Sequence, residues 1–344
     1  MTKLSLWQRI SNWVQGNSGE VVIYDGNLER HFVGSKLAEG GQGAIYALNT
    51  DPELLYKEYF APTPENERKI GELIKLSKLP GHEVIALPIS PVYMKRNTLR
   101  QWHFTGFLMP NVKDADLLFS YMHPEEREQR HPHITTKHIY VIAHNIAYAM
   151  EKIHAWRHTV IGDVNESNIL VRNNLHVTFV DADSVQYTNG RVYRCEVGKH
   201  EYVPPEGRNA GGVISQEHDL FALAVLIFQL LMWNQYPFKG RMKINIDKPQ
   251  LGLYLKDKGV FPYIDNPVAG PPAKSMPYEW LEPEIRGAFK RTFISAFKAP
   301  SKRVTAYEWR KLLQKCIERQ QTCPQHPTYQ YGYHLKKCPW CNWP

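Results

Sequence analysis

Three polar residues in the middle of the chain have types and spacing that suit metal-assisted chemistry. Asp163 is followed five residues later by Asn168, and Asp181 lies thirteen residues beyond that. Each stands beside a short run of β-branched or apolar residues, which predicts strand ends that present the polar side chains to a cleft. One carboxylate can orient an attacking hydroxyl, while an amide and a second carboxylate hold Mg²⁺ against phosphate groups. The spacing therefore predicts phosphoryl transfer from ATP.

A glycine-rich segment upstream is a candidate phosphate-binding turn. Three glycines within residues 40–43 separate two apolar runs, and glycine lets backbone N–H groups approach phosphate oxygens. The glycine turn is followed by a strand that ends at Lys57, and not by a helix, which argues against a dinucleotide-binding turn. Apolar residues at helical spacing then predict a helix over residues 65–79. On that helix, Glu72 could reach back to Lys57.

These segments, with Pro-Pro-Glu at residues 204–206 and a late Arg303, resemble the protein kinase superfamily over residues 35–317. The resemblance implies a two-lobed α+β fold, with a small β-rich N-lobe of five strands and one helix, a larger helical C-lobe and ATP in the cleft. The parts expected along the chain are an N-terminal amphipathic helix and strand extension (1–33), the N-lobe and hinge (34–112), the C-lobe (113–318) and a C-terminal zinc ribbon (319–344).

The resemblance also implies residue roles. Asp163 would orient the substrate hydroxyl, Lys57 would bind the ATP phosphates, and Glu72 would hold Lys57. Asn168 and Asp181 would be the Mg²⁺ ligands. The other residues expected around ATP are Leu37, Gly40, Gly41, Gly43, Ile45, Met109, Pro110, Val112 and Leu170.

Several positions depart from the family pattern. Gly162 stands where an arginine is usual, so no cation is expected there to hold a phosphorylated activation loop. Ala182 and Asp183 replace the usual Phe-Gly, and Asp183 could be a further Mg²⁺ carboxylate or a solvent-facing turn residue. Asn165 replaces a catalytic-loop lysine, and Lys199 replaces a threonine. We expect Lys199 to act in catalysis as the relocated cation, with a solvent-facing lysine as the alternative.

The C-terminal residues carry a separate set of metal ligands. Cys323 and His326 form a C-x₂-H pair, and Cys338 and Cys341 form a C-x₂-C pair, joined by a hairpin-like segment rich in Tyr and Gly. Two close pairs at turns predict a tetrahedral zinc site, and four protein ligands leave no open position for catalysis. So short a segment cannot bury a core alone, which couples its folding to the metal. Unpaired surface cysteines are the alternative.

Composition limits the remaining possibilities. The 344 residues allow one two-lobed unit with a small appendage, and the apolar run 220–233 is too short to span a membrane and predicts a buried helix. No cleavable leader is recognisable, and five cysteines suggest no disulfide framework, so we expect a cytoplasmic protein. The net charge of +8 is not gathered into a dense cluster, and no nucleic-acid partner is expected. The expected N-terminal helix has apolar residues on one face: Leu4, Trp7, Ile10, Trp13 and Val14.

Three functions remain open. An ATP- and Mg²⁺-dependent serine/threonine protein kinase is favoured because every residue expected to touch phosphate or metal is present. The weakened regulatory motifs would suit a pseudokinase or nucleotide-gated scaffold. A small-molecule kinase would lack the protein-substrate segment at residues 198–206. The atypical motifs also resemble a group of bacterial eukaryotic-like kinases, which implies a von Willebrand factor A-domain protein and a metal-dependent phosphatase as partners.

Overall fold

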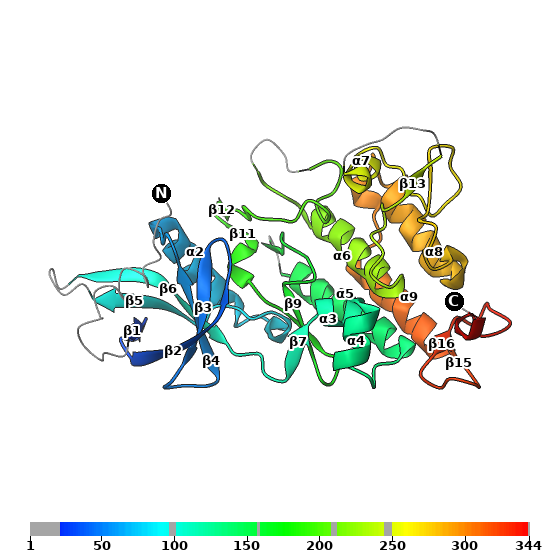
Figure 1. The fold of residues 1–344 in the computed structure, drawn as a ribbon. Coiled ribbons are helices and arrows are strands. Elements are labelled where there is room, and N and C mark those ends of the chain that lie inside the picture. The colour runs from blue at the N-terminus through cyan, green and yellow to red at the C-terminus, as the bar shows by residue number, and fades with distance from the viewer. Residues whose placement is uncertain (1–20, 96–100, 157–158, 208–211, 244–249, 343–344) are drawn as a thin grey trace. The chain divides into compact units, whose positions relative to one another are not determined.

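The computed structural model describes residues 21–95, 101–156, 159–207, 212–243 and 250–342. The amphipathic helix expected between Leu4 and Val14 lies outside these residues. Contacts divide the chain into two compact units (Figure 1). We call the part up to Lys113 the barrel unit and the part from Asp114 onward the helical unit.

The barrel unit is built on antiparallel strands that close on themselves in the order β1-β2-β3-β4-β6-β5. Strand β1 is the N-terminal extension, and it closes the barrel because it pairs with both β2 and β5. Alternate side chains of the strands point inward, and Ile23, Tyr46, Tyr56 and Leu108 lie in the resulting core. The strands are β1 (Val22–Asp25), β2 (Arg30–Glu39), β3 (Gly43–Leu48), β4 (Leu54–Tyr59), β5 (Ser90–Lys95) and β6 (Trp102–Pro110).

One α-helix of the barrel unit, α2 (Pro64–Leu76), follows β4. Thr63 begins it with a capping box, in which its side chain and that of Asn66 satisfy each other's backbone N–H groups. The helix ends three residues before the expected Leu79 because the Ser77 hydroxyl donates to the carbonyl of Ile74. A short 3₁₀ turn, η1 (His82–Val84), comes next.

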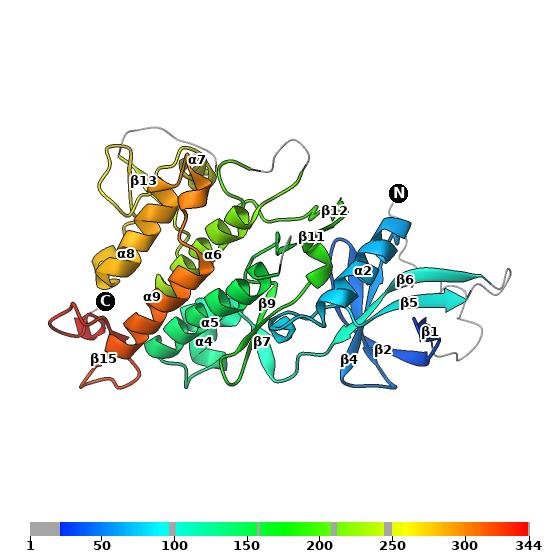
Figure 2. The same ribbon diagram turned by 180° about the vertical axis from the view of Figure 1, so that it is seen from behind.

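The helical unit is organised around α6, whose side chains are buried on nearly every face. Helices α5 and α9 pack beside each other, and α5 also packs on α6 (Figures 1 and 2). The buried helix expected over residues 220–233 is thereby confirmed. The helices are α3 (Phe119–Met122), α4 (Pro124–Arg130), α5 (Thr136–His154), α6 (Gln216–Leu231), α7 (Leu251–Asp257), α8 (Pro283–Lys290) and α9 (Ala306–Arg319).

Small sheets and turns connect these helices. Two three-stranded sheets have the orders β10-β9-β7 and β12-β11-β8, and two hairpins pair β13 with β14 and β15 with β16. The strands are β7 (Ala115–Leu117), β8 (Thr159–Val160), β9 (Ile169–Arg172), β10 (Val177–Phe179), β11 (Gln186–Asn189), β12 (Arg191–Tyr193), β13 (Arg241–Met242), β14 (Ala269–Gly270), β15 (Gln321–Thr322) and β16 (Gln330–Tyr331). The short 3₁₀ helices are η2 (Ala182–Ser184), η3 (Tyr278–Trp280), η5 (Pro300–Lys302) and η6 (Trp340–Asn342), and η4 (Arg291–Ser295) is a π-helix that follows α8. No helix among the described residues combines the length and apolarity needed to cross a bilayer.

Candidate active site

The carboxylate of Asp163 is held by two amide side chains from its own loop. Asn165 donates Nδ2 to Asp163 Oδ1 at 2.9 Å, and Asn168 donates Nδ2 to Asp163 Oδ2 at 3.0 Å. Asn165 is 1% exposed, so its contact with Asp163 is fixed by packing. Asn165 therefore positions the carboxylate, a role that the sequence pattern did not predict.

The backbone just before Asp163 is anchored by Asp219 on α6. The two carboxylate oxygens of Asp219 accept the N–H groups of Ile161 at 2.7 Å and Gly162 at 2.9 Å. His154 Nε2 lies 2.8 Å from the same carboxylate. Asp219 is buried, and a carboxylate that bonds successive N–H groups fixes the path of a loop. The sequence signal for this anchor is an acid in the first turn of an otherwise apolar helix.

Asn168 and Asp181 lie at neighbouring strand ends. The Val180 N–H donates to the carbonyl of Asn168 at 2.9 Å, which ties the residue before Asp181 to the end of the Asp163 loop. Asp181 adopts a left-handed conformation, with φ of 61° and ψ of 40°, which is rare for a residue with a side chain. The Asn168 side chain donates only through its Nδ2 atom. Its side-chain carbonyl oxygen accepts no hydrogen bond within the described residues, so that oxygen remains available as a ligand atom.

Asp183 is not solvent-facing, and that alternative from the sequence is wrong. It lies in the η2 turn and is 7% exposed, because the chain turns inward after Asp181. The neighbouring Ser184 is buried too, and its hydroxyl donates to the Asp181 carbonyl at 2.8 Å. This hydroxyl therefore stabilises the η2 turn.

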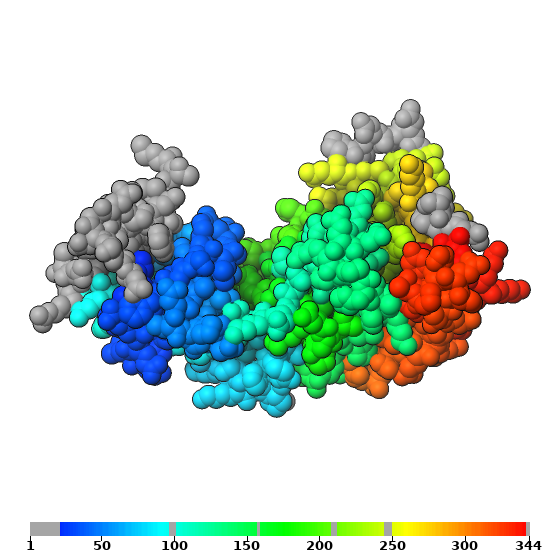
Figure 3. Space-filling view, turned by 60° about the horizontal axis from the view of Figure 1, so that its bottom comes forward, coloured from blue at the N-terminus to red at the C-terminus, as the bar shows by residue number. Residues whose placement is uncertain are grey.

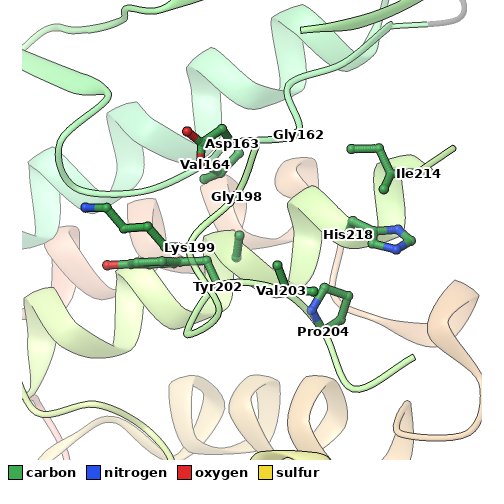
Figure 4. Close-up of a pocket in the computed structure, with 11 residues that line it drawn as sticks. Gly162, Asp163, Val164, Gly198, Lys199, Tyr202, Val203, Pro204, Ile214 and His218 are labelled. Atoms are coloured by element: carbon green, nitrogen blue, oxygen red, sulfur yellow. The ribbon is translucent and has the colours of Figure 1, made fainter. Parts of the chain in front are cut away.

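Lys199 and Asp163 line one small pocket, with a volume of about 10 Å³, the space of one water. Figure 4 shows the Lys199 side chain beside the ring of Tyr202, with Asp163 across the pocket. The Lys199 ammonium donates to Glu166 Oε1 and to the Ser167 hydroxyl, both at 2.8 Å. The structure thus brings Lys199 to the Asp163 loop, although Asn165 makes the direct contact with the carboxylate.

Glu166 connects the Asp163 loop to the segment that follows Gly198. Tyr202 donates its hydroxyl to Glu166 Oε2 at 2.5 Å. Burial favours the neutral acid, but the hydrogen bonds from Lys199 and Tyr202 outweigh it and lower the pKa of Glu166. Glu166 is therefore an ionised partner for Lys199 at neutral pH.

Gly162 is required by a close approach of Cys195. Its φ is +84°, and a Cβ added there would lie 2.6 Å from the Cys195 sulfur. Cys195 packs with Val160 and Ile214, and the Gln186 side chain bonds both the N–H and the carbonyl of Ile214. The segment after Asp181 is thus held here by packing and neutral hydrogen bonds, at the position where the family pattern has an arginine.

Glu206 and Arg303, which are distant in sequence, form a two-pronged ion pair. Arg303 Nη1 and Nη2 donate to the two carboxylate oxygens of Glu206 at 2.6 and 2.7 Å. Arg303 is 1% exposed and lies over the ring of Phe221. Because the Arg303 guanidinium is buried and bonds both carboxylate oxygens, this contact fixes the end of the segment that begins at Gly198.

In the barrel unit, the glycines of the 40–43 turn have two different environments. Gly40 and Gly41 are exposed, and a side chain on either would meet open space. A Cβ on Gly43 would instead lie 2.0 Å from the carbonyl oxygen of Glu58, so Gly43 is needed for the close approach of β3 and β4. The Gly40 N–H closes the turn on the Gly43 carbonyl at 2.9 Å.

Lys57 lies on β4 and is 6% exposed, with its ammonium 5.8 Å from the centre of the Phe107 ring. Glu72, on α2, forms an ion pair with Lys75 at 2.7 Å. The pairing of Lys57 with Glu72 stays a prediction.

The remaining residues expected around ATP lie on strands or just after them. Leu37 on β2 is 56% exposed, and Ile45 on β3 is opposite Lys57. Met109 is buried on β6 opposite Leu55. The others are Pro110 at the end of β6, Val112 two residues later, and Leu170 on β9 of the helical unit.

Glu58, beside Lys57, is a buried acid inside the barrel unit. It is 2% exposed and accepts a hydrogen bond from the Tyr46 hydroxyl at 3.3 Å. Burial raises the pKa of Glu58 from 4.5 to about 7, and the Tyr46 hydrogen bond offsets only part of that effect. In the folded barrel, Glu58 therefore keeps its proton up to about pH 7, whereas in the unfolded chain it loses that proton near pH 4.5.

This difference predicts a pH-dependent stability. Between pH 4.5 and 7 the folded state binds more protons than the unfolded state, so stability falls as the pH rises through this range. Glu58→Gln should be more stable than wild type at pH 8 by about 1–3 kcal/mol and nearly equal to it at pH 4.5. Urea unfolding at both pH values measures this, with the exposed Glu83→Gln as the control. Parallel pH curves for Glu58→Gln and wild type would refute it.

Three cysteine sulfurs gather at the C-terminus. The ligand atoms of Cys323, Cys338 and Cys341 lie within 4.8 Å of one another. Cys323 directly follows β15, the other two cysteines come after β16, and β15 and β16 pair as a hairpin. The expected fourth ligand, the His326 side chain, is not part of this group. Burial opposes the Cys323 thiolate, but hydrogen bonds from Cys341 and the His326 backbone N–H outweigh it and lower the pKa of Cys323. Three cysteine sulfurs this close together fit a zinc ion.

The C-terminal ribbon (residues 321–342) packs closely on the helical unit. The Trp340 ring stacks on Trp233 with centres 4.9 Å apart and meets the edge of Trp280 at 5.0 Å. At the start of α5, the Thr136 N–H donates to the Thr328 carbonyl and the Lys137 N–H to the Gln330 side chain. Figure 3 shows the C-terminal segment, in red, in contact with the rest of this unit. The ribbon thus caps α5 and adds to the packing of the helical unit.

Comparison with known proteins agrees with these features. The family model for the protein kinase domain matches residues 99–323, so the chain belongs to the protein kinase family and the resemblance seen in its sequence is confirmed. This membership gives a two-lobed kinase fold of mixed α and β content. The glycine turn, Lys57 and Glu72 precede the matched range.

Two curated relatives extend the likeness toward the N-terminus. The chain is 29% identical over 320 residues to protein kinase YegI of Escherichia coli O157:H7, covering 90% of this chain and 48% of that protein. It is 27% identical over 329 residues to protein kinase YegI of Escherichia coli strain K12, covering 93% and 50%. The chain spans about half the length of these relatives.

Proposed function

We propose that the chain is a protein kinase that uses ATP and Mg²⁺ to phosphorylate serine or threonine hydroxyls of protein substrates. The observation that carries this proposal is the arrangement around Asp163. Its carboxylate is held by Asn165 and Asn168, and the Asn168 backbone is tied to the residue preceding Asp181. A base and two oxygen ligands therefore come from adjoining strand ends, as phosphoryl transfer requires.

Each residue has a distinct task in this mechanism. Asp163 orients the substrate hydroxyl and accepts its proton through a carboxylate whose rotation the two amides restrict. The Asn168 side-chain carbonyl and the Asp181 carboxylate are hard oxygen donors that fit Mg²⁺. Bound Mg²⁺ and Lys57 would neutralise the ATP phosphates, with Glu72 orienting Lys57. Asp219 keeps the Asp163 loop in place through its two backbone contacts.

Protein hydroxyls are favoured over small-molecule acceptors by the segment after Gly198. Lys199 and Tyr202 from this segment both bind Glu166, and Glu206 fixes its far end to Arg303. A segment anchored at both ends beside Asp163 can support an extended polypeptide. Against a pseudokinase, each of the three residues in the Asp163, Asn168 and Asp181 set has the type that the chemistry needs.

Incubation with labelled ATP separates these alternatives. The full chain should transfer label to protein, with a von Willebrand factor A-domain protein as one candidate acceptor, and it should require Mg²⁺. Label on aminoglycosides or choline instead of protein would identify a small-molecule kinase. ATP binding without transfer to any acceptor would identify a pseudokinase.

Lys199 is proposed to supply the cation that the Asp163 loop lacks. Its ammonium already reaches Glu166 and Ser167 on that loop, and its long flexible stem allows the ammonium to turn toward a phosphoryl group beside Asp163. Asn165→Lys would not restore the common arrangement, because Asn165 is buried and holds Asp163.

Lys199→Thr should lower turnover by ~10-fold or more and change the affinity for ATP little, since the cation acts on the moving phosphoryl group. Steady-state kinetics with varied ATP checks this. Lys258→Thr, which changes an exposed lysine elsewhere in the helical unit, is the control. Wild-type turnover of Lys199→Thr would show that Lys199 is only a structural partner of Glu166.

The C-terminal cysteines are proposed to hold one structural zinc ion. Cys323, Cys338 and Cys341 supply three thiolates. His326 is exposed and follows Cys323 by three residues, so a side-chain rotation could bring its ring in as the fourth ligand. Bound zinc would fix the positions of the two turns that carry these residues.

A further inference from the structure

The hairpin that joins β1 to β2 gathers three metal-ligating side chains. Ile23 is paired with His31, and the Asp25 N–H donates to the Glu29 carbonyl at 3.0 Å. The alternation of side chains along the two strands places Asp25, Glu29 and His31 on one face. One ligand atom from each lies within 4.8 Å of the other two.

His31 is buried and has a nitrogen without a partner. It is 8% exposed, and its Nε2 forms no hydrogen bond within the described chain. Nδ1 lies 3.5 Å from the Thr50 hydroxyl oxygen. If Nδ1 carries the ring proton, it can donate a hydrogen bond to the Thr50 hydroxyl oxygen, and Nε2 then presents a lone pair. Leaving a buried acceptor unsatisfied costs about 1–3 kcal/mol, and a cation would satisfy it while Thr50 orients the ring.

The two acids supply the negative charge. Asp25 is 6% exposed, and its Oδ1 accepts the N–H groups of Asn27 at 2.9 Å and Glu29 at 2.8 Å. Those bonds hold the carboxylate in place and leave Oδ2 for another ligand. The Glu29 carboxylate is exposed and forms no ion pair within the described residues. Neither acid bonds to His31, so the three groups approach one another without direct contact.

We propose that Asp25, Glu29 and His31 form a binding site for a divalent transition-metal ion. An imidazole with two carboxylates suits Mn²⁺ or Zn²⁺ better than Mg²⁺ or Ca²⁺, which prefer oxygen ligands alone. The ion would link β1 to β2 at the hairpin, next to the point where β1 also pairs with β5 to close the barrel. The site is independent of the proposed Mg²⁺ and zinc sites in the helical unit.

Mn²⁺ is the probe that tests this site, because the C-terminal thiolates prefer zinc. The full chain, loaded with one equivalent of zinc to fill the C-terminal thiolates only, is titrated with Mn²⁺ without nucleotide, and the paramagnetic resonance signal of the free ion gives the number bound. Glu29→Gln changes an exposed side chain, and Asp25→Asn keeps an acceptor for the Asn27 and Glu29 N–H groups. Both keep Asn168 and Asp181, so binding there cancels in the comparison. Glu83→Gln is the control.

Wild type and Glu83→Gln should bind one more Mn²⁺ per chain than Glu29→Gln and Asp25→Asn, or bind that ion at least ~10-fold more tightly. Mn²⁺ should also raise the thermal unfolding midpoint of wild type by more than it raises that of the two variants. Equal numbers and affinities for wild type and Glu29→Gln would overturn the proposal. Because Glu29 is exposed, a folding defect cannot obscure that comparison.

Discussion

Replacing Asp163 with alanine should lower phosphotransfer by at least ~10²-fold, the effect of losing a positioned acid–base group. ATP binding should survive, because Asp163 contacts Asn165 and Asn168 and is not one of the proposed metal ligands. Asp181→Ala should lower transfer to a similar extent through a different step, since it removes a carboxylate proposed to hold Mg²⁺. Mg²⁺-dependent ATP binding should therefore weaken in Asp181→Ala and change little in Asp163→Ala.

Two measurements separate these effects. Initial rates with labelled ATP give the loss of transfer, and fluorescence titration with a nucleotide analogue gives the loss of binding. Asp265→Asn changes a fully exposed acid of the same unit and should leave both unchanged. Transfer at the wild-type rate by either Asp163→Ala or Asp181→Ala would exclude the proposed mechanism.

Loss of the C-terminal metal should unfold more than the ribbon itself. The ribbon caps two N–H groups of α5, and each such hydrogen bond contributes about 1 kcal/mol. Trp340 also packs on Trp233 and Trp280, and each aromatic pair adds about 0.5–1.5 kcal/mol. Cys338→Ser should therefore destabilise the helical unit by at least about 3 kcal/mol, the lower end of this sum.

That loss corresponds to a fall of about 6–12 °C in the unfolding midpoint for a unit of this size. Calorimetry, with elemental analysis for zinc, measures both outcomes. Lys336→Ala changes an exposed residue of the ribbon and should keep the metal and the midpoint. Protein that contains no zinc when purified without chelator would refute the metal assignment. Retained zinc in Cys338→Ser would show that the ligand set is wrong.

Local sequence spacing was enough to predict the strand ends beside which Asn168 and Asp181 lie. The strand ends that carry Asn168 and Asp181 form because short apolar runs precede or follow them, and their pairing is between neighbours in the chain. The buried helix over residues 220–233 is also a local property, because it depends only on a run of apolar residues. These parts needed no knowledge of distant contacts.

Other features depend on contacts between distant residues and could not be read from the sequence. Asp219 holds a loop 57 residues earlier in the chain, and no local pattern identifies that partner. Lys199 was expected to act as a relocated cation, but its partner Glu166 lies 33 residues away. The solvent-facing alternative for Asp183 is wrong because turn propensity does not reveal whether a turn faces the core. Similarly, residue type and spacing predicted His326 as a zinc ligand, but they do not determine the side-chain orientation, and the His326 ring lies outside the cysteine group.

The most direct test of the proposed function is to identify the amino acid that receives the phosphate. The full chain is incubated with γ-labelled ATP and a protein acceptor, with and without Mg²⁺, and the hydrolysed product is separated into its phosphoamino acids. The arrangement around Asp163 predicts phosphoserine or phosphothreonine only with Mg²⁺, and at least ~10²-fold less with Asp163→Ala. Equal label from wild type and Asp163→Ala, or none from wild type despite bound ATP, would contradict it.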